Sequence, residues 1–116
     1  MKLIQIYRIR TFVVPEYLDK VVHGVLAIDD LRYGNYKNVI WNSEGGIEQF
    51  VPSENSIPKE GTIGETTKVN SLKVEFSIPR DEELLAKIIE EGIYPHHPWD
   101  EPVVQVIEAL ESRKNS

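Results

Sequence analysis

The sequence contains no cysteine among its 116 residues. Disulfide bonds, a thiol nucleophile, zinc–thiolate centres and iron–sulfur clusters are therefore all excluded. The opening segment, MKLIQIYRIR, returns to charged residues too soon to form the apolar core of a signal peptide. Both observations fit a reducing compartment, and we expect a cytoplasmic location for the protein.

Long apolar runs and an excess of basic residues are also missing. No run approaches the roughly 20 apolar residues that a membrane-spanning helix needs, so we expect no membrane partner. The 19 acidic residues outnumber the 13 basic ones, and the net charge of −6 argues against nucleic acid as a partner. The apolar share of 41% is typical of a soluble globular protein. We therefore expect one domain over residues 1–110, followed by a polar tail over residues 111–116.

Hydrophobic periodicity predicts six elements in the order strand, helix, strand, strand, helix, strand. Residues 3–14 are rich in β-branched and aromatic side chains and predict a long strand, and an apolar stripe with helical spacing follows Pro15. Residues 69–78 alternate between apolar and polar side chains, which predicts a strand with one buried face. Acidic residues at 81–83 open a second helix, which Gly92 is expected to end. Shorter strands are predicted at 39–41 and within 42–51, and the last strand at 103–110.

This order is the βαββαβ pattern of the ferredoxin-like sandwich, an α+β fold in which two helices cover one face of an antiparallel sheet. The other face of such a sheet would be bare. Apolar residues occur on both parities of residues 3–14, however, which indicates that this face is partly covered or that a bulge changes the register. The simplest cover is other copies of the chain, so we expect a closed homo-oligomer.

The stretch YPHHPWDEP at residues 94–102 is the part of the sequence most like a site of chemistry. No cofactor is evident in the sequence, but imidazole and carboxylate groups are good ligands for a divalent metal. Pro98 forces His97 into an extended conformation, and strand alternation lets at most His97 and one carboxylate, such as Glu101, converge. Two interpretations remain: a proline-braced turn with Trp99 packed in the core, or a metal site completed by another subunit.

Other patterns of catalytic chemistry are weak. The glycine-rich stretches SEGG and EGTIGE lack the lysine and hydroxyl residues of a phosphate-binding loop, and no strained nucleophile turn is visible. No catalytic residue is assigned, and a binding module is favoured over an enzyme. Residues 52–67 are rich in proline, glycine and small polar side chains, which predicts a long surface loop of the kind that is often functional or mobile.

Several motifs occur in an order that resembles the inserted central domain of the Nif-three family (NGG-one-interacting factor three). They are GNY at 34–36, SEGGIEQFVP at 43–52, IGE at 63–65, VEFSIPRDEELLAKII at 74–89 and HPWDEP at 97–102. In the last motif Trp99 stands where the family usually has tyrosine, and Asp100 where it has glutamate. The chain also lacks the flanking lobes that carry the family's metal ligands, so neither that dinuclear site nor a hydrolase activity is transferred.

The resemblance implies a fold like that of the PII signalling proteins and the CutA proteins, which usually assemble as trimers. It implies a ligand or metal in a cleft between subunits, beside the loop at 52–67. The ligand-binding residues that it implies are Tyr36, Glu65, His97, Trp99 and Glu101, with His97 and Glu101 as the metal candidates. A metal-dependent enzyme built across the interface, or a protein-docking module that uses the loop at 52–67, are the alternatives.

Overall fold

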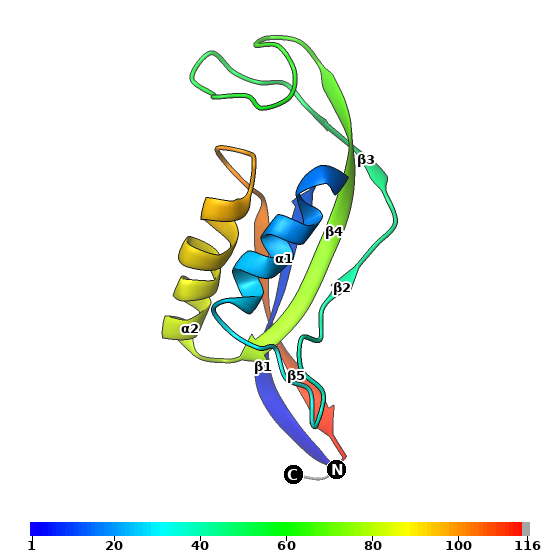
Figure 1. Ribbon diagram of the computed structural model, residues 1–116, viewed down its shortest axis with the longest axis vertical. Helices are drawn as coiled ribbons and strands as arrows, with labels where there is room; N and C mark the ends of the chain where they lie inside the picture. Colours follow the sequence, from blue (N-terminus) through cyan, green and yellow to red (C-terminus); the bar gives the residue numbers. More distant parts are fainter. Residues whose placement is uncertain (115–116) are drawn as a thin grey trace.

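The computed structural model describes residues 1–114 as an antiparallel sheet with the helices packed on one of its faces (Figure 1). The strands are hydrogen-bonded in the order β2-β4-β1-β5, and β3 also pairs with β4. None of the described helices is long and apolar enough to cross a membrane. In chain order the elements are β1 (Lys2–Val13), the 3-10 helix η1 (Pro15–Tyr17), α1 (Leu18–Leu26), β2 (Trp41–Asn42), β3 (Gly46–Phe50), β4 (Thr67–Pro79), α2 (Glu82–Lys87), the π-helix η2 (Ile88–Ile93), the 3-10 helix η3 (Tyr94–His96) and β5 (Val104–Arg113).

Strands β2 and β3 together occupy the place of one strand along the outer edge of β4. β2 pairs with residues 74–75 of β4, and β3 pairs with residues 67–71. Between them, the Ser43 amide donates to the Lys73 carbonyl at 2.9 Å, and the Lys73 amide donates to Ser43 Oγ at 2.8 Å. The predicted α+β fold with βαββαβ order is therefore confirmed, and its second strand is interrupted at residues 43–45.

The core lies between the sheet and the helices. Ile9 of β1 lies opposite Phe76 of β4, and both side chains are fully buried. Val21 and Val25 of α1 and Ile88 of η2 pack in the same cluster from the helix layer. Each such side chain contributes about 1.5–3 kcal/mol of burial free energy, so this layer contact is the main source of stability. The alternation predicted for residues 69–78 is confirmed by the burial of Val74, Phe76 and Ile78.

The opposite, open face of the sheet carries a cluster of charges. The Glu75 side chain is only 13% exposed and forms ion pairs with Arg8 at 3.3 Å, with Arg10, and with Lys73 at 4.0 Å. Burial raises the pKa of Glu75, but the hydrogen bond from Arg8 and the positive charges around it outweigh burial and leave that pKa below its ordinary value. The cluster therefore stays ionised at neutral pH.

Part of this open face is covered by the chain itself. Ile6 alternates onto the same face as the charged cluster, yet it is only 2% exposed. Leu31, Tyr33 and Val39, from the connection between α1 and β2, line a small cavity together with Ile6. The Tyr33 hydroxyl donates to the Ser112 carbonyl at 2.6 Å and holds this connection against β5. Coverage of the remaining face by other copies of the chain stays a prediction.

Two predicted boundaries are wrong. Gly92 does not end the second helix, because it lies inside η2 and helical structure continues into η3. Gly92 packs closely against Gly24 of α1, so it serves the contact between the helices. The last strand extends to Arg113 because β5 pairs with the first residues of β1. The polar tail predicted at 111–116 therefore begins after β5, and residues 115–116 lie outside the described residues.

Candidate functional site

The hairpin of β3 and β4 extends beyond the rest of the sheet. β4 pairs with β1 only from Leu72 onward, so residues 67–71 have β3 as their only partner strand. The hairpin loop, residues 51–66, folds back at this end of the molecule toward the link, residues 97–103, which joins η3 to β5 (Figure 1). The segments that sequence analysis singled out for separate reasons thus meet in space.

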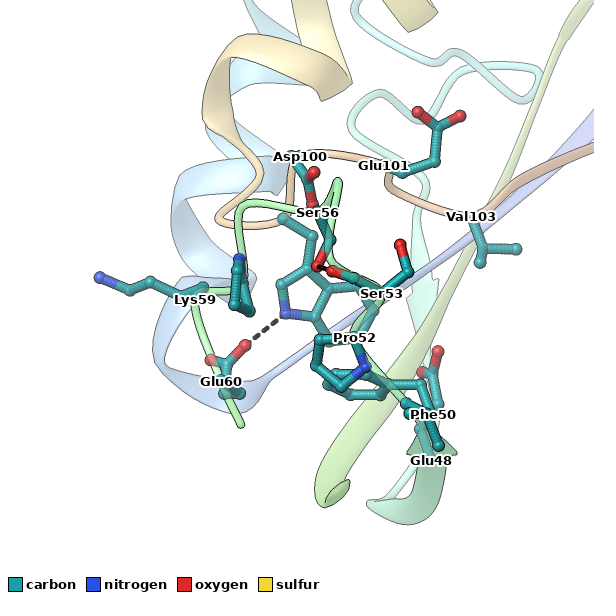
Figure 2. Close-up of a pocket in the computed structure, with 13 residues that line it drawn as sticks. Glu48, Phe50, Pro52, Ser53, Ser56, Lys59, Glu60, Asp100, Glu101 and Val103 are labelled. Carbon is teal, nitrogen blue, oxygen red and sulfur yellow. Dashed lines mark hydrogen bonds between the residues drawn. The ribbon is translucent and has the colours of Figure 1, made fainter. Parts of the chain in front are cut away.

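Two hydrogen bonds join the hairpin loop to the link, and one aromatic contact joins the end of β3 to it. Trp99 Nε1 donates to Glu60 Oε2 at 2.6 Å, the bond drawn as a dashed line in Figure 2. The Ile57 amide donates to Asp100 Oδ2 at 3.0 Å. The ring of Phe50, at the end of β3, lies 5.9 Å from the Trp99 ring between centroids. Hydrogen bonds to a charged acceptor are worth about 1.5–3 kcal/mol, so these contacts are strong enough to hold the loop closed.

A cavity of about 280 Å³ lies between the hairpin loop and the link (Figure 2). Four carboxylates line it, those of Glu48, Glu60, Asp100 and Glu101, against the single ammonium of Lys59. Figure 2 shows the Lys59 ammonium directed away from the other labelled side chains. The interior is therefore acidic as well as apolar. Its apolar wall comes from Phe50, Val51, Pro52, Pro58, Trp99 and Val103.

His97 holds the link against β1. Its side chain is only 8% exposed, Nε2 lies 2.6 Å from the Phe12 carbonyl oxygen, and Nδ1 accepts from the Trp99 amide at 3.2 Å. These partners assign the proton to Nε2 of a neutral ring. Burial lowers the pKa of His97, and the Phe12 carbonyl and the charges of Glu48 and Glu60 oppose the shift only in part. Both ring nitrogens are thus used by backbone groups.

The structure brings together some of the predicted ligand-binding residues and separates others. Trp99 and Glu101 line the cavity, and the His97 ring packs against Trp99 with its centroid 5.2 Å away. Glu65 lies in the hairpin loop but does not line the cavity. Tyr36 is 76% exposed in the turn that Tyr33 begins, near the far end of β5. Tyr36 therefore belongs to the opposite end of the molecule.

A metal centre has no ligand set in the part of the chain that the structure describes. Residues 1–114 contain no group of three or more histidine, aspartate or glutamate side chains placed to hold an ion. His97 and Glu101, the predicted metal candidates, are not joined by any hydrogen bond, and the His97 nitrogens already have backbone partners. Within one copy of the chain, His97 holds the link through hydrogen bonds with backbone groups, and a metal site completed by another subunit stays a prediction.

Several cavity residues were not singled out from the sequence. Glu48 and Phe50 come from β3, Glu60 from the hairpin loop and Asp100 from the link, and only tertiary contacts bring these three segments together. Phe50 carried a signal, because it belongs to the Phe-x-Pro part of the family motif. Glu60 gave no such sequence signal, because a single glutamate in a polar loop belongs to no motif or periodic pattern that would predict its hydrogen bond with Trp99.

Replacing Trp99 with phenylalanine is expected to release the hairpin loop. The change keeps an aromatic ring beside Phe50 but removes the bond to Glu60, so local opening becomes easier by about 1.5 kcal/mol. Hydrogen exchange at the Ile57 amide should then accelerate by about tenfold. Trp41→Phe, which changes an exposed tryptophan of β2, is the matched control. Unchanged exchange in Trp99→Phe would show that the bond does not hold the loop.

Comparison with known proteins places this fold among PII-like and CutA-like structures. No family model matches the sequence, and no curated protein sequence does. A Bacillus cereus protein related to NIF3, the Nif-three family, superposes with a TM-score of 0.73 at 22% identity, over 94% of this chain and 27% of that one. The chain thus spans about a quarter of the length of that protein, and the resemblance seen in the sequence is confirmed at the level of the fold.

Two further structures match over most of both chains. One is CPII, a nitrogen regulatory PII-like protein from Thiomonas intermedia K12 bound to ADP, AMP and bicarbonate, with TM-score 0.58 and 16% identity over 97% of this chain and 98% of that one. The other is the divalent ion tolerance protein CutA1 from Ehrlichia chaffeensis, with TM-score 0.59 and 13% identity over 94% and 85%. At these identities the likeness shows the fold: the chain is a small α+β module of PII/CutA-like architecture.

Proposed function

We propose that the chain is a homo-oligomeric binding or regulatory module, most simply a trimer. Its ligand binds in the cavity between the hairpin loop and the link, at the boundary between subunits. The observation that carries this proposal is a cavity with both carboxylate and apolar walls, closed by the hairpin loop. Glu60 and Ile57 of the loop are hydrogen-bonded to Trp99 and Asp100 of the link. A ligand with different affinities for the closed and open loop shifts their populations, and the loop passes that change to a partner.

The charge of the cavity determines which ligands fit. Four carboxylates repel phosphate groups, and the Lys59 ammonium lies 5.8 Å from the centre of the Tyr17 ring. CPII, which shares the fold, is bound to ADP and AMP in its structure. Adenine compounds are therefore suitable probes. Because the cavity is acidic, we expect the neutral nucleoside adenosine to bind more tightly than the negatively charged AMP and ADP. The flat apolar rings of Phe50 and Trp99 offer a surface on which a base can pack.

The open face of the sheet supports the oligomer. The ion cluster around Glu75 lies on this face, and Ile107 and Trp41, which alternate onto it, are 38% and 49% exposed. Polar and apolar groups are mixed here as in ordinary interfaces between subunits. We infer that this face packs against other copies of the chain, and that a trimer places each cavity next to a second copy.

Two measurements test the proposal. Light scattering should give three times the 13.3 kDa chain mass, that is about 40 kDa. For binding, Trp41→Phe leaves Trp99 as the only tryptophan, because the sequence has two. Titration with adenosine should then change Trp99 fluorescence in a saturable way. ADP should bind at least about tenfold more weakly than adenosine, because its phosphates approach the four carboxylates.

Each part of the proposal has its own contradicting result. A monomeric mass of 13.3 kDa at micromolar concentration would contradict the assembly. A lack of saturable response to adenosine, AMP and ADP would contradict the ligand site, and tighter binding of ADP would contradict the charge argument. Tyr36→Phe, at the far end of the molecule, is the matched control and should leave the adenosine titration unchanged.

A protein-docking role for the hairpin loop is the second candidate, because the loop exposes three large apolar side chains. Ile57 is 77% exposed, Val51 54% and Ile63 48%, so one loop presents several large apolar side chains to solvent. Affinity capture with the wild-type chain and with an Ile57→Ser, Ile63→Ser variant would test this role. A partner retained equally by both proteins would rule out the loop as its docking site.

A further inference from the structure

A second cavity of about 380 Å³ lies beside β3 on the open face of the sheet. β4 contributes Ser71 and Lys73, β3 contributes Glu48, and Phe12 comes from the end of β1. Glu48 and Val103 line this cavity and the first one, so Glu48 stands between the two. The remaining lining residues are Ser43, Glu44, Gly46 and Ile47.

Two buried polar atoms at this cavity have no hydrogen-bond partner within residues 1–114. Ser71 is only 7% exposed, and its Oγ is unpartnered. Glu48 Oε1 is equally buried and unpartnered. Leaving such groups unsatisfied costs about 1–3 kcal/mol each, and more for a charged group, so folded proteins rarely do so without a reason.

The position of the two side chains lets one molecule reach both. Gly46 pairs with Ser71 and Glu48 pairs with Val69, so Glu48 and Ser71 are diagonal neighbours on the same face of the β3–β4 pair. The Cβ atoms of diagonal neighbours lie somewhat less than about 7–8 Å apart, and the glutamate side chain extends two carbons beyond its Cβ, so Glu48 can reach far enough for one donor group to contact both side chains.

The chain supplies no cation for Glu48 among its described residues. The Lys73 ammonium lies 4.0 Å from Glu75 and 5.2 Å from the centre of the Trp41 ring, so it is already engaged. The neutral ring of His97 is committed to the Phe12 carbonyl. A carboxylate with a buried oxygen and no cationic neighbour favours a positively charged ligand.

We propose that this second cavity binds a small organic molecule that carries a primary ammonium group. The ammonium donates hydrogen bonds to Glu48 Oε1 and Ser71 Oγ, and the apolar part of the molecule packs against Phe12 and Val103. An ammonium needs only acceptors in reach, whereas a divalent metal needs a set of ligands that the described residues do not form. This site shares Glu48 and Val103 with the cavity assigned above, but it is proposed whether or not an adenine compound binds there.

Chemical-shift titration of the ¹⁵N-labelled full chain tests the proposal with propylamine hydrochloride as the probe. At neutral pH and matched ionic strength, propylammonium should shift the amides of Glu48 and Ser71 in a saturable way. Propan-1-ol and sodium propionate, which have the same carbon chain without the positive charge, should not saturate. Glu48→Gln should weaken propylammonium binding by about tenfold, because it removes the charged acceptor.

Glu44→Gln is the matched control, since Glu44 also lines the cavity but is exposed to solvent. It should leave binding within about threefold of wild type. Three results would overturn the proposal: equal responses to propylammonium and propan-1-ol, binding unaffected by Glu48→Gln, or saturation by Mg²⁺ in place of propylammonium. A fourth contradicting result has two parts: the wild-type chain does not respond to propylammonium, and Glu48→Gln no longer forms an oligomer. That result would assign Glu48 Oε1 and Ser71 Oγ to a contact between copies of the chain.

Discussion

Replacing Gly24 with alanine is expected to lower the free energy of unfolding by about 2–3 kcal/mol. A Cβ at this position would lie less than 3.0 Å from His96 Nδ1 and from the Gly92 carbonyl oxygen. The carbonyl belongs to the helix backbone, so α1 and η2 would have to move apart. Without this contact the sign would be opposite, because alanine in place of glycine inside a helix stabilises by about 0.5–1 kcal/mol. Urea unfolding followed by circular dichroism, at one fixed protein concentration, measures the change.

Gly92→Ala is the matched control for this prediction. The nearest atoms to a Cβ at Gly92 are the Gly24 carbonyl oxygen and Val25 Cα, both at 3.3 Å, which small shifts can relieve. We expect a change of less than about 1 kcal/mol in either direction. Equal effects of the two substitutions would show that the crossing of α1 and η2 is not the tight contact that the structure indicates.

Replacing His97 with phenylalanine is expected to destabilise the fold by about 2–3 kcal/mol at pH 7.5. Phenylalanine keeps an aromatic ring of similar width, but it leaves the buried Phe12 carbonyl and the Trp99 amide without their partners. The link would lose its attachment to β1, so the hairpin loop that it holds should also exchange faster. His23→Phe changes an exposed histidine of α1 and should alter stability by less than about 0.5 kcal/mol.

The same histidine makes the stability of the fold depend on pH. Burial holds the pKa of His97 in the folded state below its ordinary value of 6.5, so the unfolded chain binds this proton more readily. The stabilisation is fully present above pH 6.5 and falls as the pH decreases from 6.5 toward the folded-state pKa. The slope in this window is at most about 1.4 kcal/mol per pH unit.

Unfolding free energies of wild type and His97→Phe between pH 5 and 7.5 test this dependence. The wild-type curve should fall on acidification, and the curve of the variant should be flatter by the contribution of His97. Glu75 does not affect this comparison. Its pKa is lowered from 4.5, so its contribution to the free energy of unfolding is lost only at pH values below this range. Parallel curves would show that His97 is not held neutral in the folded protein.

Interpretation of the link shows how far the sequence alone could reach. Pro98 dictates an extended His97, and the backbone angles of His97 are φ −94° and ψ 140°, as predicted. The sequence also allowed a metal at His97 and Glu101, because imidazole and carboxylate groups are ordinary ligands. The tertiary structure gives both His97 nitrogens backbone partners, one of them 85 residues away in β1. No local pattern encodes a bond of that separation.

Local periodicity determined the order of the elements. Apolar alternation over residues 69–78 and the helical stripe after Pro15 are properties of neighbouring residues, and burial of one face follows directly from them. The predicted end of the second helix was wrong because Gly92, a residue type that usually ends helices, packs here against the neighbouring helix. The predicted end of the last strand was wrong because pairing with β1 extends β5 through polar residues to Arg113.

The composition and periodicity of the sequence by themselves determined an α+β sheet-and-helix fold with a long loop between its second and third strands. Only the tertiary structure decided where that loop rests and which carboxylates it gathers. Trp99 and Glu60 are 39 residues apart, and Glu48 and Ser71 become neighbours only through the pairing of β3 with β4. The physical reason is that a site is formed by residues distant in sequence, whereas periodicity reports only how each segment divides its own surface between core and solvent.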